Sequence, residues 1–479
     1  MIRVKWLRLA IATTMPLLVM GCDTLKQVEF NCDNSSVSST PNLSQNLNIQ
    51  MYVDGTPSMQ GYVTHPQNTR TRYIETIDLL DQTLLTGWTP QSRNQSQVQY
   101  FRLGENYQKI NRDDYLLARQ AKFYDGKVPQ KFPLLKVSNI DNAITPAQDN
   151  KLTVIVTDLY QKGADVTKLK QKLLSENYFN PSQPGYAVGI LAIKSEFNGD
   201  VYLEDGTDKK FTYTTNNSQG NVINGKELRP FYVIFLGRYS DIADYLNKLS
   251  ESQKIPENSQ VTIFSPSNLV TEVAYLQRLS KDSQNKGSDK PHKDLKFRQS
   301  LKEEIKVNKN PKNELFAIDQ KANQDITVNY QVPLKTDNHT LQVDPTSIET
   351  KMKVDTSALS PGAATASKTL QEVASDSQLQ TALALNQWQI NGNNLSFQTT
   401  IKPSLFPQRE IYLFTVEALA KRVQTQPWWV EWNTYSNSSN DWKTYNLQPF
   451  MEGLKDNTEN FMSKSPVVVG RFCFAMQKN

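Results

Sequence analysis

The feature that most constrains this fold is a short strand-like run, residues 47–53, which a polar turn and then a helical pattern follow. The turn begins at Asp54 and carries Thr56 and Ser58 at alternating positions. Beyond it, apolar residues recur at helical spacing over residues 70–86, which predicts a helix with one face packed on a sheet. Hard cations such as Mg²⁺ prefer oxygen ligands, so this strand end offers one ion three short side chains.

A second strand-like run, residues 152–157, is apolar and β-branched, as in a strand buried on both faces, and Asp158 follows it directly. Strands alternating with helices indicate an α/β fold with a doubly wound, mostly parallel sheet. In such sheets ligands bind outside the carboxyl ends of the strands, where Asp54 and Asp158 fall. Further strands are predicted at 98–103, 186–193 and 231–236, and further helices at 166–174 and 242–249.

The Asp54, Thr56 and Ser58 pattern resembles the DxSxS metal-ion-dependent adhesion site (MIDAS) of von Willebrand factor A (VWA) domains, with Thr in place of the first Ser. The resemblance covers residues 47–250, and Asp158 matches the family's second acidic position. The segment 137–144 is similar to a family loop that supplies a third hydroxyl. That hydroxyl is then Ser138, where the family prefers Thr, with Asp141 as an alternative donor.

The resemblance implies a site for Mg²⁺, with Mn²⁺ or Ca²⁺ as alternatives. Thr56, Ser58 and Ser138 would be direct ligands, and Asp54 and Asp158 would hold the ion directly or through water. An acidic side chain of a protein partner would fill the open position.

Two other interpretations of the Asp54 turn stay open at this point. Asp-Gly and Thr-Pro are turn formers, so residues 54–58 can be a plain tight connection after a strand. The same letters also resemble the nucleophile motif of haloacid dehalogenase phosphatases. That motif needs a nucleophilic Asp two residues before its second Asp, and Tyr52 occupies this position.

The N-terminus resembles a bacterial lipoprotein signal, because residues 1–21 combine a basic start with a short apolar run before Cys22. This implies a lipid-modified Cys22, a tether over residues 22–46, and a location on the periplasmic or extracellular side of a membrane. Asp23 resembles the inner-membrane retention signal of enteric bacteria. The alternative is an ordinary cleaved signal in which Cys22 has no role.

Charge and cysteine content narrow the function further. Residues 1–21 hold three basic and no acidic residues, so their removal lowers the formal charge from +5 to +2, which argues against a nucleic-acid binder. With Cys22 assigned to the lipid, only Cys32 and Cys473 remain. Outside the cytosol these two favour a disulfide, and two buried free thiols are the alternative.

The rest of the chain has a different pattern. Residues 251–420 contain alternating polar and apolar runs with turn signals, which predict an antiparallel β-sandwich-like region. Within it, residues 281–314 carry ten basic and six acidic side chains, as in a solvated basic loop. Residues 421–479 form a small Trp-rich segment in which core packing is more common than a recognition surface, and a helix is predicted to end at Gly453.

Catalysis has little support in the sequence. The three histidines, His65, His292 and His339, lie in polar surroundings without a metal-ligand spacing or a nearby nucleophile motif. We therefore expect a non-enzymatic, membrane-anchored lipoprotein that binds a protein partner through a metal site. The alternative is a metal-independent structural or assembly lipoprotein of the cell envelope.

Overall fold

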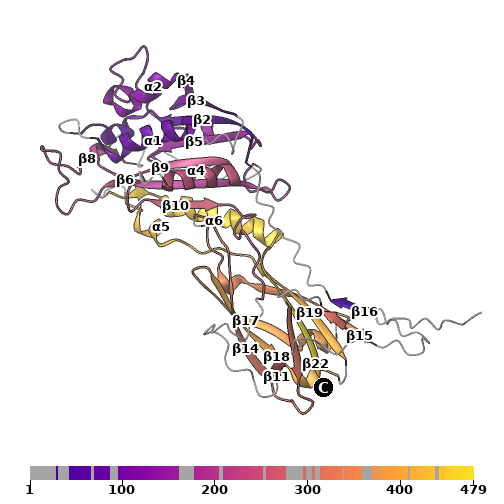
Figure 1. Cartoon of the computed structure of the whole chain (residues 1–479). Coiled ribbons are helices and arrows are strands. Elements are labelled where there is room, and N and C mark those ends of the chain that lie inside the picture. The colour runs from indigo at the N-terminus through magenta and orange to yellow at the C-terminus, as the bar shows by residue number, and fades with distance from the viewer. Residues whose placement is uncertain are drawn as a thin grey trace, which may run out of the picture.

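Figure 1 shows the computed structural model of the chain. The residues that the structure describes are 28–30, 43–65, 70–86, 95–160, 177–203, 209–251, 255–276, 295–297, 305–307, 313–337, 339–358, 369–375, 377–407, 410–436 and 442–478. The signal segment, Cys22, Cys32, His292 and the helix predicted at 166–174 lie outside these ranges. Within them, no helix is both long and apolar enough to cross a membrane.

The upper part of the molecule in Figure 1 is built on a seven-stranded sheet with the order β10-β6-β9-β5-β2-β3-β4. The central strand β2 pairs in parallel with β3 and with β5, and the other four pairings are antiparallel. The strands are β2 (Asn46–Asp54), β3 (Gln95–Leu103), β4 (Tyr107–Ile110), β5 (Lys151–Thr157), β6 (Tyr186–Ser195), β9 (Arg229–Arg238) and β10 (Gln260–Phe264).

This sheet confirms the α/β class but corrects the expectation that it is mostly parallel, because only β5, β2 and β3 pair in parallel. The strand β9 lies between β5 and β6 and is antiparallel to both. A strand buried on both faces has the same apolar pattern in either direction, so the pattern cannot give its orientation. The chain reaches β9 from β6 through the hairpin of β7 (Asn198–Tyr202) and β8 (Lys210–Thr214).

Each face of the sheet is covered by different elements. On one face, Ile49, Met51 and Val53 of β2 share an apolar core with α1 (Arg72–Thr86) and α4 (Tyr239–Glu251). On the other face, residues such as Tyr52 belong to a core that includes the C-terminal α5 (Pro427–Glu431) and α6 (Leu447–Lys464). Residues alternate between the faces along a strand, so one strand contributes to both cores.

The lower part of Figure 1 consists of two packed sheets, a six-stranded one (β11-β13-β22-β19-β15-β16) and a three-stranded one (β14-β18-β17). Ring pairs join them, such as Phe397 with Phe472 at 4.5 Å between centroids. All pairings are antiparallel except that of β13 with β22, which confirms a β-sandwich-like region. The strands are β11 (Leu295–Phe297), β13 (Asn313–Ile318), β14 (Ile326–Pro333), β15 (Glu349–Ala358), β16 (Thr369–Glu372), β17 (Leu383–Asn391), β18 (Asn394–Ile401), β19 (Ile411–Ala420) and β22 (Val467–Lys478).

The chain passes between the two parts more than once. The strand β10 lies beyond residue 250, where the first domain was predicted to end, yet it is an edge strand of the first sheet. The strand β22, near the C-terminus, is an inner strand of the second sheet. Within the basic segment 281–314 the structure has β11, β12 (Ile305–Val307) and the start of β13, and β12 pairs with β1 (Val28–Phe30). The predicted domain boundaries stay predictions.

The Trp-rich segment packs into the core, as its composition indicated. Trp428, Trp429 and Trp432 are buried, and Trp429 stacks on Phe264 of β10. The prediction that the following helix ends at Gly453 is wrong, because α6 continues to Lys464 with Gly453 buried inside it. Burial of Leu454, Phe461 and Met462 offsets the roughly 1 kcal/mol that a helical glycine costs.

The remaining described elements are short. They are η1 (Pro57–Tyr62), α2 (Arg112–Leu116), η3 (Leu117–Arg119), η4 (Ala121–Phe123), η5 (Ile140–Ala143), η6 (Pro345–Ser347), η7 (Gln378–Thr381), η8 (Pro403–Leu405), β20 (Asn433–Thr434) and β21 (Thr444–Tyr445). Among these, η1, η5 and the β20–β21 pair lie next to the candidate site described below.

Candidate metal site at the carboxyl end of the central strands

Asp54 is the last residue of β2 and the centre of the candidate site. Its Oδ1 accepts hydrogen bonds from the Thr56 backbone N–H at 3.0 Å and from the Thr56 hydroxyl at 2.7 Å. The Thr56 and Ser58 hydroxyls lie 3.1 Å apart. These bonds to an Asp side chain from two residues further on form the Asx-type turn that the sequence indicated. The turn interpretation and the site interpretation are therefore compatible.

Gly55 is required inside this turn. A Cβ atom at this position would lie 2.6 Å from Nε of Arg102 and 3.1 Å from a methyl carbon of Leu135. Arg102 is held by its own hydrogen bonds, so its side chain cannot move aside for a Cβ atom without breaking them. The turn therefore holds Asp54 and Thr56 close against the neighbouring strand.

The second carboxylate comes from the end of β5, beside β2. Since the two strands are parallel and Val53 is paired with Val156, their carboxyl ends meet at one edge of the sheet. The Thr157 hydroxyl donates to Oδ2 of Asp54 at 3.0 Å. Asp158 accepts from the Tyr160 N–H at 3.0 Å, and Leu159 between them has a left-handed backbone with φ of 62°. A leucine rarely adopts this conformation, so the surrounding contacts impose it.

Ser138 lies in the loop before η5, as expected. This loop is fixed by the Asn139 N–H, which donates to the Gly104 carbonyl at 2.9 Å. The Ser138 hydroxyl is buried near Asp54, yet among the described residues it forms no hydrogen bond of normal geometry. Asp141, the alternative donor, is only partly buried in η5. A buried hydroxyl without a partner is costly, so this atom is suited to a ligand.

All five candidate ligands are between 0% and 4% exposed. Burial, followed by the charge of Asp158, raises the pKa of Asp54, while hydrogen bonds from Thr56 and the nearby hydroxyl of Ser138 act in the opposite direction. Burial also raises the pKa of Asp158, while Arg229 and then the Tyr160 N–H lower it. Two buried carboxylates with the same charge repel each other, and a divalent cation between them would relieve this.

The donor set fits a hard cation. It consists of two carboxylates and three hydroxyls from three loops, and oxygen ligands of this kind suit Mg²⁺ or Mn²⁺. Within the described ranges, no group of three or more His, Cys, Asp or Glu side chains comes together. An ion at this edge would therefore depend on Thr56, Ser58 and Ser138 as well as on the two aspartates.

Arg102 of β3 is a site residue that the sequence analysis missed. It is 1% exposed, and its guanidinium donates to the carbonyls of Gly55 at 3.1 Å, Phe123 at 2.8 Å and Pro133 at 3.0 Å. Burial lowers its pKa to about 10, so it stays charged at neutral pH. The signal was an arginine between Phe101 and Leu103 in a strand candidate, and an arginine is rarely buried without partners.

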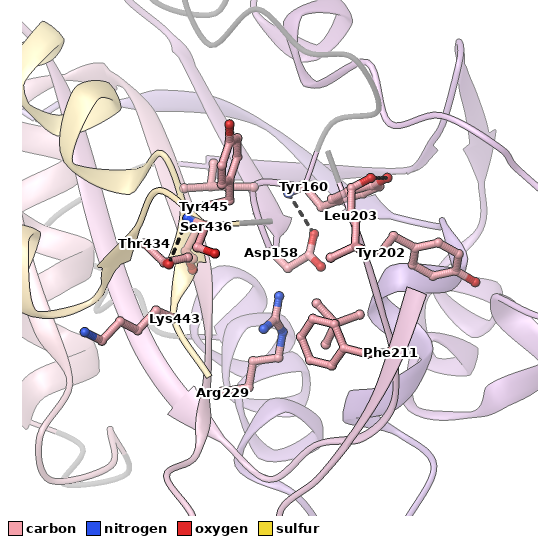
Figure 2. Close-up of a pocket in the computed structure, with 13 residues that line it drawn as sticks. Asp158, Tyr160, Tyr202, Leu203, Phe211, Arg229, Thr434, Ser436, Lys443 and Tyr445 are labelled. Carbon is pink, nitrogen blue, oxygen red and sulfur yellow. Dashed lines mark hydrogen bonds between the residues drawn. The ribbon is translucent and has the colours of Figure 1, made fainter. Parts of the chain in front are cut away.

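A small cavity of about 40 Å³ adjoins the candidate site, and Figure 2 shows the side chains around it. Of the five candidate ligands only Asp158 lines it. Its other walls come from the β7–β8 hairpin, from Arg229 of β9, and from residues 434, 436 and 443–445 around β20 and β21. The cavity therefore reaches the candidate site at Asp158.

Comparison of the chain with protein-family models gave no match, and comparison with curated protein sequences gave none either. The function is therefore inferred from the residues of the site and from the sequence patterns.

Proposed function

We propose that this protein is a membrane-anchored extracytoplasmic lipoprotein that binds a protein partner through a divalent metal held at the edge of a VWA-like sheet. Cys22 would carry the lipid, with the protein on the periplasmic or extracellular side. The observation that supports the metal site most is the gathering of Asp54, Asp158 and the hydroxyls of Thr56 and Ser58 near the buried Ser138 hydroxyl, which has no hydrogen bond of normal geometry among the described residues.

Two kinds of side chain would hold the metal ion. Thr56, Ser58 and Ser138 would coordinate the ion directly, and Asp54 and Asp158 would hold it directly or through water. A bound Mg²⁺ with neutral hydroxyl ligands would remain electrophilic enough to attract an acidic side chain of the partner. We propose binding rather than catalysis, since the residues that would bind the metal offer no separate nucleophile or base.

The test is calorimetric titration of the full chain, purified in detergent, with Mg²⁺ and with Mn²⁺. We expect binding to the unmodified protein, and no measurable binding to Asp54→Ala or Asp158→Ala. Asp113→Ala is the matched control, because Asp113 is an exposed carboxylate on α2, and it should bind as the unmodified protein does. Saturating metal at 100 times Kd should also stabilise the fold by about 2.7 kcal/mol.

One observation favours the alternative, a metal-independent structural or assembly lipoprotein. The positive charges of Arg229 and Arg102 already act on the site and offset part of its negative charge. If the unmodified protein binds neither ion, and its partners in an envelope extract are retained in the presence of a chelator, the alternative holds and the metal proposal fails.

A further inference from the structure

The cavity of Figure 2 combines a cation with an apolar wall. Arg229 is the first residue of β9 and only 8% exposed, and in Figure 2 its guanidinium points toward the space between Asp158 and Phe211. The ring of Phe197 lies 5.5 Å from the guanidinium carbon, and Nη1 approaches the Trp442 carbonyl at 3.5 Å. These contacts fix the direction of the side chain.

The size and walls of the cavity limit what can enter it. A volume of about 40 Å³ holds a small polar group and is far below the 300 Å³ or more of a typical pocket for a whole small molecule. Val201, Leu203 and Phe211 line it with apolar surface, while Ser436 and Thr434 bring hydroxyls. A short aliphatic stem that ends in a polar head matches this division.

The charges select the head group. Asp54 and Asp158 together carry −2, and Arg229 and Arg102 together carry +2, so a divalent ion would leave the loaded site with a net positive charge. A carboxylate supplies one negative charge, and its two oxygens match the fork of a guanidinium. Without the metal the same groups sum to zero and would attract an anion far less strongly.

We propose that this cavity is the subsite for the partner's acidic group: an Asp or Glu side chain enters beside Asp158, and its carboxylate pairs with Arg229. This inference rests on the proposed function, because it needs the metal to make the site positive. In this proposal Arg229 selects a carboxylate over other groups. Bound metal then raises the affinity for the carboxylate, and bound carboxylate raises the affinity for the metal by the same factor.

The chain offers a matched control in Lys443, the other cation on the cavity wall. In the view of Figure 2 its ammonium points away from Asp158 and Arg229, and it lies 6.0 Å from the ring of Trp442. Replacing Lys443 therefore removes a charge of the same sign from the same wall, but it leaves Arg229, the residue proposed to bind the carboxylate, in place.

The experiment measures Mn²⁺ affinity of the full chain in detergent by calorimetry, with and without a glutamate whose backbone is blocked as N-acetyl and methylamide. The blocked glutamate should tighten Mn²⁺ binding about 5-fold or more, which is the lower range of a typical coupling. The blocked glutamine, its uncharged isostere, should not. Arg229→Gln should lose the enhancement relative to its own Mn²⁺ affinity in chloride buffer, and Lys443→Gln should keep it.

The outcomes separate the two proposals. If the unmodified protein binds no Mn²⁺ in any buffer, both the proposed function and this subsite fail. If it binds Mn²⁺ but blocked glutamate has no effect, or if Arg229→Gln keeps the effect, only the subsite is overturned. A larger enhancement by inorganic phosphate would also overturn it. Arg229→Lys, which retains the charge and should keep part of the enhancement, together with melting curves of all variants, excludes misfolding as the cause of a loss.

Discussion

At the scale of single residues, the molecule keeps two carboxyl groups of equal charge at one buried edge. Asp54 is completely buried, and the charge of Asp158 adds to the burial in raising its pKa. A raised pKa means that the folded protein holds a proton on Asp54 more readily than the unfolded chain does. The metal-free fold therefore loses stability as the pH rises above the ordinary Asp range near 4, and the loss persists at neutral pH.

We predict that Asp54→Asn stabilises the metal-free protein at pH 7, by on the order of 1 kcal/mol, because it removes this charge. An Asn can keep both hydrogen bonds that Thr56 donates to Oδ1, and its amide can donate to the Thr157 hydroxyl. Melting curves between pH 4 and pH 7, with a chelator present, measure the effect.

Two comparisons test this explanation. Asp113→Asn, at an exposed carboxyl, should leave the melting curve unchanged, and added Mg²⁺ should stabilise the unmodified protein but not Asp54→Asn. A metal-free Asp54→Asn that melts lower than the unmodified protein at pH 7 would show that the charge of Asp54 supports the fold rather than opposing it.

At the scale of elements, the site depends on loops that Arg102 of β3 holds together. Its guanidinium binds the carbonyl of Gly55 in the turn after β2 and the carbonyl of Pro133, which precedes the Ser138 loop. It also binds the Phe123 carbonyl at the end of η4. One buried side chain thus sets the distance between the loop of Asp54 and the loop of Ser138.

We predict that Arg102→Met destabilises the protein by about 3 kcal/mol or more, because three carbonyls, two of them on the buried residues Gly55 and Phe123, lose their donor while the apolar part of the side chain is retained. Arg70→Met is the matched control. Arg70 pairs with Asp78 on the surface, and exposed ion pairs contribute about 0–1 kcal/mol. Chemical denaturation of both variants provides the comparison, and equal midpoints would contradict this role of Arg102.

The elements show which aspects of the fold the sequence could reveal. Apolar periodicity located β2, β5, α1 and α4, because burial on a sheet imposes the spacing of apolar residues. The direction of β9 could not be read, since a buried strand has no polar face to distinguish orientations. Arg102 and Arg229 were missed for another reason: their partners are backbone carbonyls and cavity walls that only the three-dimensional fold brings together.

At the scale of the whole molecule, the covalent link at Cys473 joins distant parts of the chain. Cys473 is fully buried in β22 and disulfide-bonded, and its partner lies outside the described residues. With Cys22 assigned to the lipid, Cys32 stays the predicted partner. Next to it in sequence, β1 pairs with β12, so the N-terminal segment reaches residues 305–307.

We predict that Cys32→Ser lowers the stability of the protein by about 2–5 kcal/mol, the usual effect of removing a native disulfide. Mass spectrometry of peptides from the non-reduced protein should show Cys32 joined to Cys473, and the joined pair should vanish on reduction. Finding Cys473 joined to Cys22 would contradict both this pairing and the lipid assignment.

The position of β22 has a consequence for the order in which the protein is made. In the second sheet β22 lies between β13 and β19, and in the first part α6 covers one face of a sheet that begins with β2. Ribosomes deliver residues 46–420 before either element is available. Both parts therefore keep an open gap in a sheet or an uncovered apolar face until residues 447–478 have joined them, so neither part completes its fold from its own earlier residues.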